Sequence, residues 1–128
     1  MKKISSLLFA FTIFICISFQ RPLNDNSCKI MRNGTFVYGN PSSEVKVVIK
    51  GDKHIEYHHE GKYIIKSRIK WLNDCEYNMT MTEITIPQFP YTVGDIMNVK
   101  ITRVEGNNIF YTSTVKGNSW EGQFTKVK

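Results

Sequence analysis

The feature that most constrains this chain is a period-two alternation of apolar and polar side chains, broken at short intervals by turn residues. Val45, Val47 and Ile49 alternate with lysines until Gly51 and Asp52 end the run. Such alternation is typical of a β-strand with one buried face, because successive strand residues point to opposite faces. No segment shows an apolar stripe of 3.6-residue period, so we expect little helix.

The same pattern recurs along the chain and predicts eight or nine short strands. The expected strands are Lys29–Met31, Thr35–Tyr38, Glu44–Lys50, His54–His58, Tyr63–Trp71, a strand that starts at Cys75, Ile96–Val104, Ile109–Val115 and Trp120–Val127. The connections are too short for parallel crossovers. The expected fold is therefore an all-β antiparallel meander that closes or curls into a small lipocalin-like barrel.

Two irregularities in the pattern locate a bulge and a loop. After Thr82 the apolar phase slips by one residue to Ile84, which predicts a β-bulge near Glu83. Pro87 and Pro90 cannot donate hydrogen bonds within a sheet, so the segment around them is expected to be a connecting loop.

The N-terminus has the pattern of a secretory signal. A basic start at Met1-Lys2-Lys3 precedes an apolar run from Ile4 to Phe19, which is short for a permanent anchor. We expect a signal peptide at residues 1–19 and a single β domain at residues 20–128. The protein is then secreted, periplasmic or associated with an outer membrane.

Lipid attachment is the competing interpretation of this segment, because Cys16 lies within the apolar run. Lipidation needs a small residue before the cysteine, and Ile15 stands there. Cys28 follows Ser27 but lies well beyond the apolar run. Cleavage and release therefore fit the residues better than lipid anchoring.

Two cysteines, Cys28 and Cys75, follow the expected signal, and an even number in an exported chain indicates a disulfide. Cys75 comes directly after an Asn73-Asp74 turn that reverses the strand ending at Trp71. A bridge would fasten the start of the domain to this hairpin. Two free thiols, or a bond to another chain, are the alternatives.

Some of these residues resemble a group of small exported or lipid-anchored proteins of Bacteroidota. The shared pattern is an early cysteine, then Gly34-Thr35-Phe36, then the segment from Ile69 to Tyr77 and a lysine-rich C-terminal strand. The resemblance implies a cell-envelope location and a small β fold, and it brings no catalytic residues. A topoisomerase label carried by some members has no physical basis in these residues. Gly34-Thr35-Phe36 is also loosely similar to the opening of a lipocalin's first strand.

A metal site is one hypothesis for the histidine-rich strand. His54, Glu56 and His58 share one strand face, with about 7 Å between each residue and the next on that face. Two imidazoles and a carboxylate could bind zinc or copper. The alternative is a solvated hairpin face opposite Ile55 and Tyr57.

Other chemistry finds less support in the sequence. There is no Gly-x-Ser-x-Gly motif and no phosphate-binding glycine loop. Ser67 is expected to be a buried hydroxyl, and Glu76 and Glu83 to face water or balance nearby lysines. The formal net charge of +6 is dispersed, without the basic and aromatic clustering of a nucleic-acid groove. We expect no enzyme activity, no cofactor and no nucleic-acid partner.

Aromatic side chains are numerous and could line a ligand pocket. The candidate ligand-binding residues are Tyr63, Trp71, Tyr77, Phe89, Tyr91 and Tyr111. The favoured hypothesis is a non-enzymatic barrel that binds a small apolar ligand or an envelope component. A filled core with an exposed Phe89/Tyr91 loop for a protein partner is the alternative. A cavity above about 300 Å³ would favour the first hypothesis, and a solid interior the second.

Overall fold

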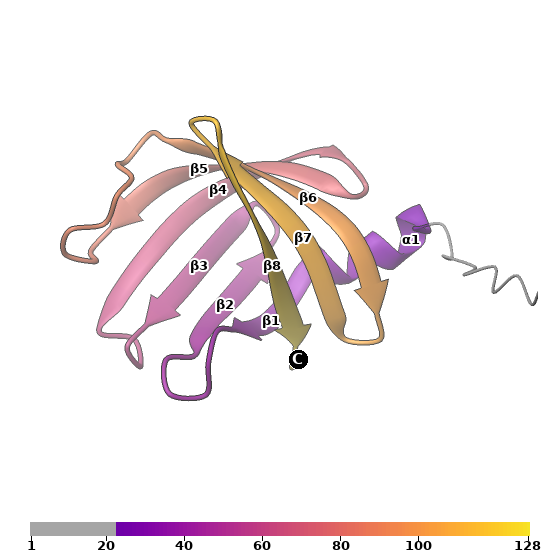
Figure 1. Ribbon diagram of the computed structural model, residues 1–128, viewed down its shortest axis with the longest axis horizontal. Coiled ribbons are helices and arrows are strands. Elements are labelled where there is room, and N and C mark those ends of the chain that lie inside the picture. The colour runs from indigo at the N-terminus through magenta and orange to yellow at the C-terminus, as the bar shows by residue number, and fades with distance from the viewer. Residues whose placement is uncertain (1–22) are drawn as a thin grey trace, which may run out of the picture.

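The chain forms a closed antiparallel β-barrel in the computed structural model, which describes residues 23–128 (Figure 1). The eight strands are paired in chain order and close by pairing the first with the last, so the predicted meander barrel is confirmed. The elements are α1 (Asp25–Cys28), the 3₁₀ helix η1 (Lys29–Met31), β1 (Asn33–Tyr38), β2 (Val45–Lys50), β3 (Lys53–His58), β4 (Tyr63–Asn73), β5 (Glu76–Ile84), β6 (Ile96–Glu105), β7 (Asn108–Val115) and β8 (Asn118–Lys126). The expected signal peptide lies outside the described residues. Within them, no helix has the length and apolarity needed to cross a bilayer.

The barrel interior is built by alternate residues of every strand. In β2 the alternation of buried and exposed positions follows the sequence pattern, with Val45, Val47 and Ile49 buried. Phe36 of β1, Tyr77 of β5 and their inward neighbours continue the same core around the barrel. Burying these side chains provides the main favourable contribution to folding, because apolar surface leaves water.

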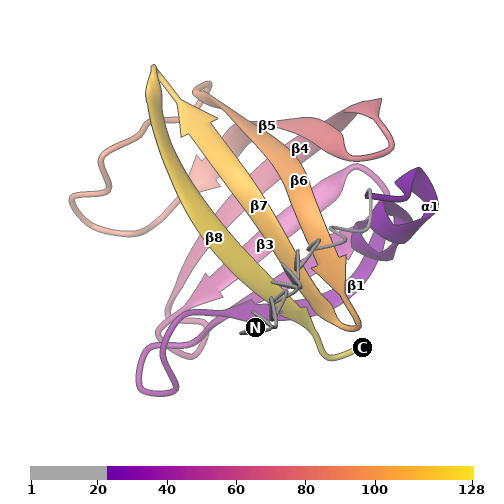
Figure 2. The same cartoon turned by 45° about the vertical axis from the view of Figure 1, so that its right-hand side comes forward.

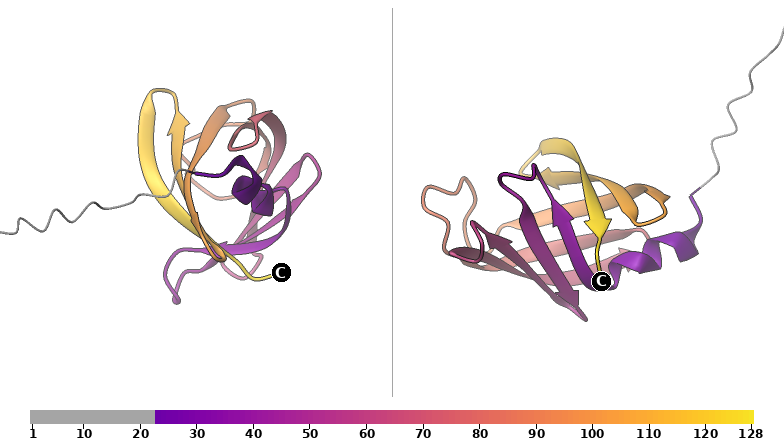
Figure 3. Two further views of the ribbon diagram at one scale, coloured as in Figure 1. Left: turned by 90° about the vertical axis from the view of Figure 1, so that its right-hand side faces the viewer. Right: turned by 90° about the horizontal axis from the view of Figure 1, so that it is seen from below.

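One end of the barrel is covered by the short helical segment (Figure 3, left). The expected strand at Lys29–Met31 is instead the 3₁₀ helix η1, which follows directly on α1. Cys28 and Met31 are fully buried at this end, and the Lys126 Nζ donates to the carbonyls of Ile30 and Asn33 at 3.2 and 2.9 Å. Residues 29–31 are helical because a helical turn lets Met31 pack into the end of the barrel, whereas the sequence pattern suggested a strand.

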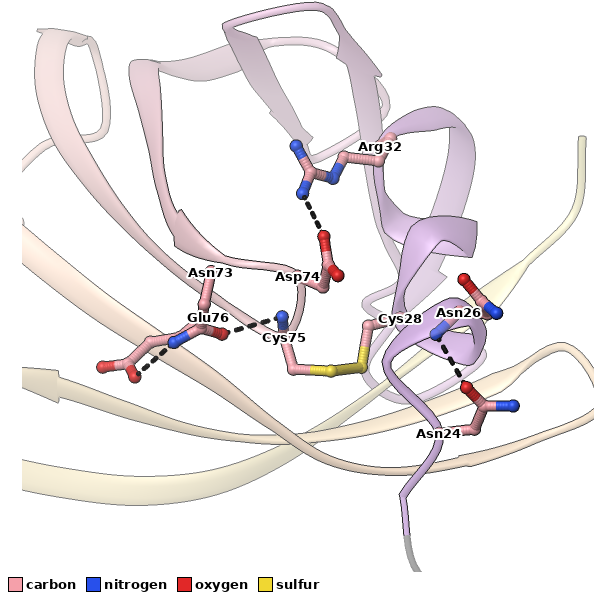
Figure 4. The surroundings of a disulfide bond; sticks show 8 residues. All are labelled: Asn24, Asn26, Cys28, Arg32, Asn73, Asp74, Cys75 and Glu76. Carbon is pink, nitrogen blue, oxygen red and sulfur yellow. Dashed lines mark hydrogen bonds and ion pairs between the residues drawn. A yellow bond between two sulfur atoms is a disulfide. The ribbon is translucent and has the colours of Figure 1, made fainter.

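The predicted disulfide joins this segment to the β4–β5 hairpin (Figure 4). Cys28 and Cys75 are bonded, with their Cα atoms 5.2 Å apart. The Asn73 side-chain oxygen accepts from the Cys75 backbone N–H at 2.9 Å, which fixes the turn as its sequence predicted. Arg32 adds an ion pair of 3.4 Å to Asp74.

The opposite end of the barrel carries the long β5–β6 loop, residues 85–95, on the far side of the molecule from α1 (Figure 1). The expected loop at Pro87–Tyr91 is therefore confirmed, as is a register shift in β5 opposite Lys66 and Ser67, close to Glu83. Asp95 ends the loop by accepting from the Thr92 N–H at 2.9 Å. That bond and Lys116 at 3.3 Å hold the pKa of Asp95 below its ordinary value.

The barrel closes where β8 returns to β1, after running beside β7 (Figure 2). Phe36 and Val37 pair with Lys126 and Thr125. The pairing continues through Thr35, whose N–H donates to Lys128 O at 2.9 Å. The register pairs of this seam involve only two residues of each strand, so closure protects only part of each edge from pairing with another chain.

Candidate ligand-binding site

A cavity of about 190 Å³ lies inside the barrel, at the end opposite the disulfide-linked helical segment. Tyr38 and His58 line it from the ends of β1 and β3, and the 85–95 loop contributes to its mouth. The full lining is Tyr38, His54, Glu56, His58, Ile65, Tyr77, Met79, Phe89, Tyr91, Met97, Val99, Tyr111, Ser113, Trp120 and Phe124. Seven of these residues are aromatic, so the wall is largely apolar with a small polar group.

The polar group is the inward face of β3. His54, Glu56 and His58 share one face, as their spacing predicts, but this face is the barrel interior and not the solvated face of a hairpin. His54 is only 1% exposed. The solvated face expected from the sequence is therefore wrong, because polarity alone favoured Ile55 and Tyr57 as the core side of this strand.

Glu56 lies at the centre of this group. Its carboxylate accepts from the Tyr38 hydroxyl at 2.8 Å, and its other oxygen lies 3.7 Å from His58 Nε2. Burial by itself raises the pKa of Glu56, but its polar neighbours, His58 foremost and the Tyr38 hydroxyl among them, outweigh burial, and the pKa is lowered from its ordinary value. The cavity therefore contains an ionised carboxylate at neutral pH.

His54 and Tyr77 are buried beneath Glu56 with polar atoms that remain unpaired. Neither ring nitrogen of His54 has a hydrogen-bond partner from another described residue, and neither has the Tyr77 hydroxyl. Burial lowers the pKa of His54, so its imidazole is neutral at pH 7. Burial raises the pKa of Tyr77, and its phenol keeps its proton. Both groups can donate and accept hydrogen bonds toward the cavity.

Aromatic side chains form the mouth. Phe89 lies edge-on to Tyr91, with ring centroids 5.8 Å apart, and Tyr91 stacks on Trp120 of β8 at 6.5 Å. Phe89 and Tyr91 are half-buried and turn toward the barrel, rather than standing out for a protein partner. Trp120 remains 38% exposed at the rim.

The structure brings four of the six candidate ligand residues to the cavity. Tyr77, Phe89, Tyr91 and Tyr111 line it, whereas Tyr63 and Trp71 do not. The remaining two serve other contacts. Tyr63 packs edge-on against His59 at the rim, and Trp71 lies near the other end, between Arg32 and Tyr77.

Tyr111 owes its position to a glycine on the neighbouring strand. Tyr111 pairs with Gly122 across β7 and β8, and a Cβ atom at Gly122 would lie 2.4 Å from the tyrosine Cζ and Oη. The ring therefore lies over the glycine and stacks on Phe124, with centroids 4.5 Å apart. Gly122 lacks a turn context in the sequence, and this close approach explains it.

Several lining residues were missed as ligand candidates in the sequence. Tyr38, Ser113 and Trp120 lie on different strands, and only barrel closure places them around one space. The inward phase of β7 could have indicated Ser113, because it alternates with Tyr111 and Val115, which are both buried.

The metal hypothesis finds no support in the geometry. Among residues 23–128, no group of three or more His, Cys, Asp or Glu side chains is arranged to hold a metal ion. Of the three candidate ligands, Glu56 and His58 approach each other, with 3.7 Å between the carboxylate oxygen and Nε2. A second depression, of about 590 Å³, lies between the 39–44 and 59–62 loops, but most of its lining is exposed.

The other polar candidates have structural roles. Ser67 is buried on the inner face of β4, as expected. Glu83 pairs with Lys66 at 3.3 Å outside the barrel, and Glu76 accepts from Asn98 at 3.0 Å.

Comparison of the chain with protein-family models, curated proteins and solved structures finds no match.

Proposed function

We propose that this protein is an exported, non-enzymatic β-barrel module that binds a small, largely apolar ligand within the barrel. The observation that carries the proposal is the aromatic-lined cavity, to which seven of the eight strands and the 85–95 loop contribute, with a few polar groups in its wall. This combination of an apolar wall and convergent polar atoms is typical of small-molecule sites. We call the barrel lipocalin-like because it is an eight-stranded antiparallel meander with a cavity inside it.

The size of the cavity limits the ligand. Its volume of about 190 Å³ is below the 300 Å³ named above as favouring ligand binding, so the size criterion is not met, although the interior is not solid either. It equals the liquid volume of roughly six water molecules. The ligand is therefore a compact molecule, about the size of one substituted aromatic ring, rather than a long-chain fatty acid.

Export is supported by the covalent structure as well as by the N-terminal pattern. Disulfides such as Cys28–Cys75 persist in oxidising compartments, and stable disulfides are rare in cytosolic proteins. A cell-envelope location would place the barrel where small molecules from outside are captured.

Titration with a neutral probe, phenethyl alcohol, tests the proposal. Amide NMR signals of Met79 and Ser113, which line the cavity, should shift on binding. Ser113→Ile fills the cavity from inside and should abolish the shifts. Thr112→Ile places the same side chain on the outer face of the same strand and should preserve them.

The contrary outcome is specific. Shifts confined to the exposed surface, unchanged by Ser113→Ile, would refute ligand binding in the barrel. They would favour the alternative of a protein-interaction module that uses the 85–95 loop, where Val93 and Ile96 beside it are 62% and 54% exposed.

A further inference from the structure

We propose that the ligand is a small organic cation, an amine with a compact apolar body, whose ammonium group binds at Glu56. This inference rests on the proposed ligand-binding function and specifies its chemistry. Three independent features of the cavity support it: the sign of its charge, the aromatic rings beside that charge and the unpaired polar atoms beneath it.

The charge of the cavity favours a cation. Glu56 is the only Asp or Glu among the lining residues, and the basic side chains of the lining are two histidines, of which His58 lies 3.7 Å from Glu56. The protein as a whole is basic, with a formal net charge of +6, so this buried carboxylate is contrary to the general composition. A carboxylate ligand would be repelled at close range, whereas an ammonium group would gain a charge-assisted hydrogen bond.

The rings next to Glu56 suit the same ligand. The Tyr38 hydroxyl that bonds to Glu56 belongs to a ring that meets Phe124 edge-on at 5.5 Å, and Phe124 in turn stacks on Tyr111. A cation held at the carboxylate therefore lies close to the Tyr38 ring, in a wall that contains further aromatic side chains. Such faces attract cations through their quadrupoles, most strongly where water is excluded.

The unpaired atoms below Glu56 add acceptors and donors. A neutral His54 imidazole offers one accepting nitrogen, and the Tyr77 hydroxyl offers an oxygen. Burying such groups unpaired costs free energy, so a ligand that hydrogen-bonds to them gains more affinity than its apolar contacts alone provide. A primary amine has three N–H donors and can bond to more than one of these atoms.

Three probes of matched size test the inference on the wild-type protein: phenethylamine, phenethyl alcohol and phenylacetate. We expect phenethylamine to bind at least about tenfold more tightly than phenethyl alcohol, and phenylacetate to bind most weakly. Dissociation constants come from NMR titration of the cavity amides. Equal or tighter binding of the alcohol would overturn the cation proposal and leave ligand binding intact. Binding of none of the three inside the barrel would overturn both.

A variant pair assigns the preference to its residue. Glu56→Gln keeps an acceptor for the Tyr38 hydroxyl but removes the charge, so amine and alcohol should bind with similar affinity. Glu83→Gln removes a carboxylate outside the barrel and should keep the wild-type preference. An undiminished preference in folded Glu56→Gln would refute the assignment. If that variant does not fold, the relative affinities of the three probes for the wild-type protein still decide whether the site prefers a cation.

Discussion

At the scale of single residues, the burial of His54 opposes stability. Its ring nitrogens are buried without partners from other residues, at a cost of about 1–3 kcal/mol. A leucine or valine would fill the same inward position of β3 without this cost. Positions where a sequence departs from the most stable choice tend to serve a function. The burial of His54 in the cavity wall is therefore in line with the ligand-binding function proposed above.

His54 also makes stability depend on pH. Its pKa is lowered by burial from the ordinary 6.5, so the unfolded chain takes up a proton before the folded chain does. Its contribution is fully present above pH 6.5 and is lost as the pH falls toward the lower folded-state pKa. We expect the free energy of unfolding in urea to decrease from about pH 7 to about pH 5, by at most about 1.4 kcal/mol per pH unit.

Two variants isolate this effect. His54→Gln should flatten the decrease, whereas His59→Gln, at an exposed loop position, should keep it. The pKa of Glu56 is also lowered, so its own loss of stability begins only below its ordinary value of 4.5. A His54→Gln protein with the wild-type slope between pH 7 and 5 would contradict the assignment.

At the scale of elements, the β4–β5 hairpin is both a pair of strands and an anchor for the helical segment. The turn at Asn73 presents Cys75 to Cys28, while Arg32 lies over the Trp71 ring at 3.9 Å. These contacts join residues far apart in the chain, since the bonded cysteines are separated by 47 positions. The closed end of the barrel is thus held covalently, while the mouth is held by weaker contacts such as Asp95–Lys116.

Removing the disulfide should lower stability while leaving the barrel strands paired. For a separation of 47 residues, the chain-entropy argument gives a loss of about 4 kcal/mol in the Cys28→Ser/Cys75→Ser protein. Guanidinium unfolding with and without a reducing agent measures it. The reduced wild-type protein is the control and should match the double variant. A loss below about 1 kcal/mol would show that the unfolded chain is restricted by other means.

At the scale of the whole molecule, closure of the barrel depends on the seam between β1 and β8. Only Phe36 and Val37 form regular register pairs there, so the flanking bonds of Thr35 carry part of the closure. Gly34 permits these bonds, because it has a φ of +142° and a Cβ atom there would lie 2.5 Å from Lys128 O. Without the seam the cavity would open along its side.

Gly34→Ala should therefore destabilise the protein more than Gly51→Ala does. Both glycines have positive φ, but a Cβ at Gly51 would meet no atom within 4 Å. Backbone strain alone predicts about 1–2 kcal/mol at Gly51, and the clash at the seam should add at least about 2 kcal/mol at Gly34. Thermal unfolding measures the difference, and faster amide exchange at Val127 would locate it. Equal losses would contradict the role of the seam.

Much of this architecture could be predicted from local signals. Alternation in Val45–Lys50 and Tyr63–Trp71 predicted two of the strands, and the prolines at 87 and 90 predicted the loop. The Asn73-Asp74 pair predicted the turn that positions Cys75. Each of these depends on neighbours within a few residues. Lys29–Met31 is the exception, because a short apolar run does not distinguish a strand from a helical turn.

The sequence by itself determined the strands, their turns and the cysteines available for pairing, because backbone preference and alternation act over short distances. Only the tertiary structure decided which face of β3 is interior, since either His54 and Glu56 or Ile55 and Tyr57 could have faced the core. Closure then placed Tyr38, Ser113 and Trp120 around one space. A cavity is a property of many strands at once, and no local pattern encodes it.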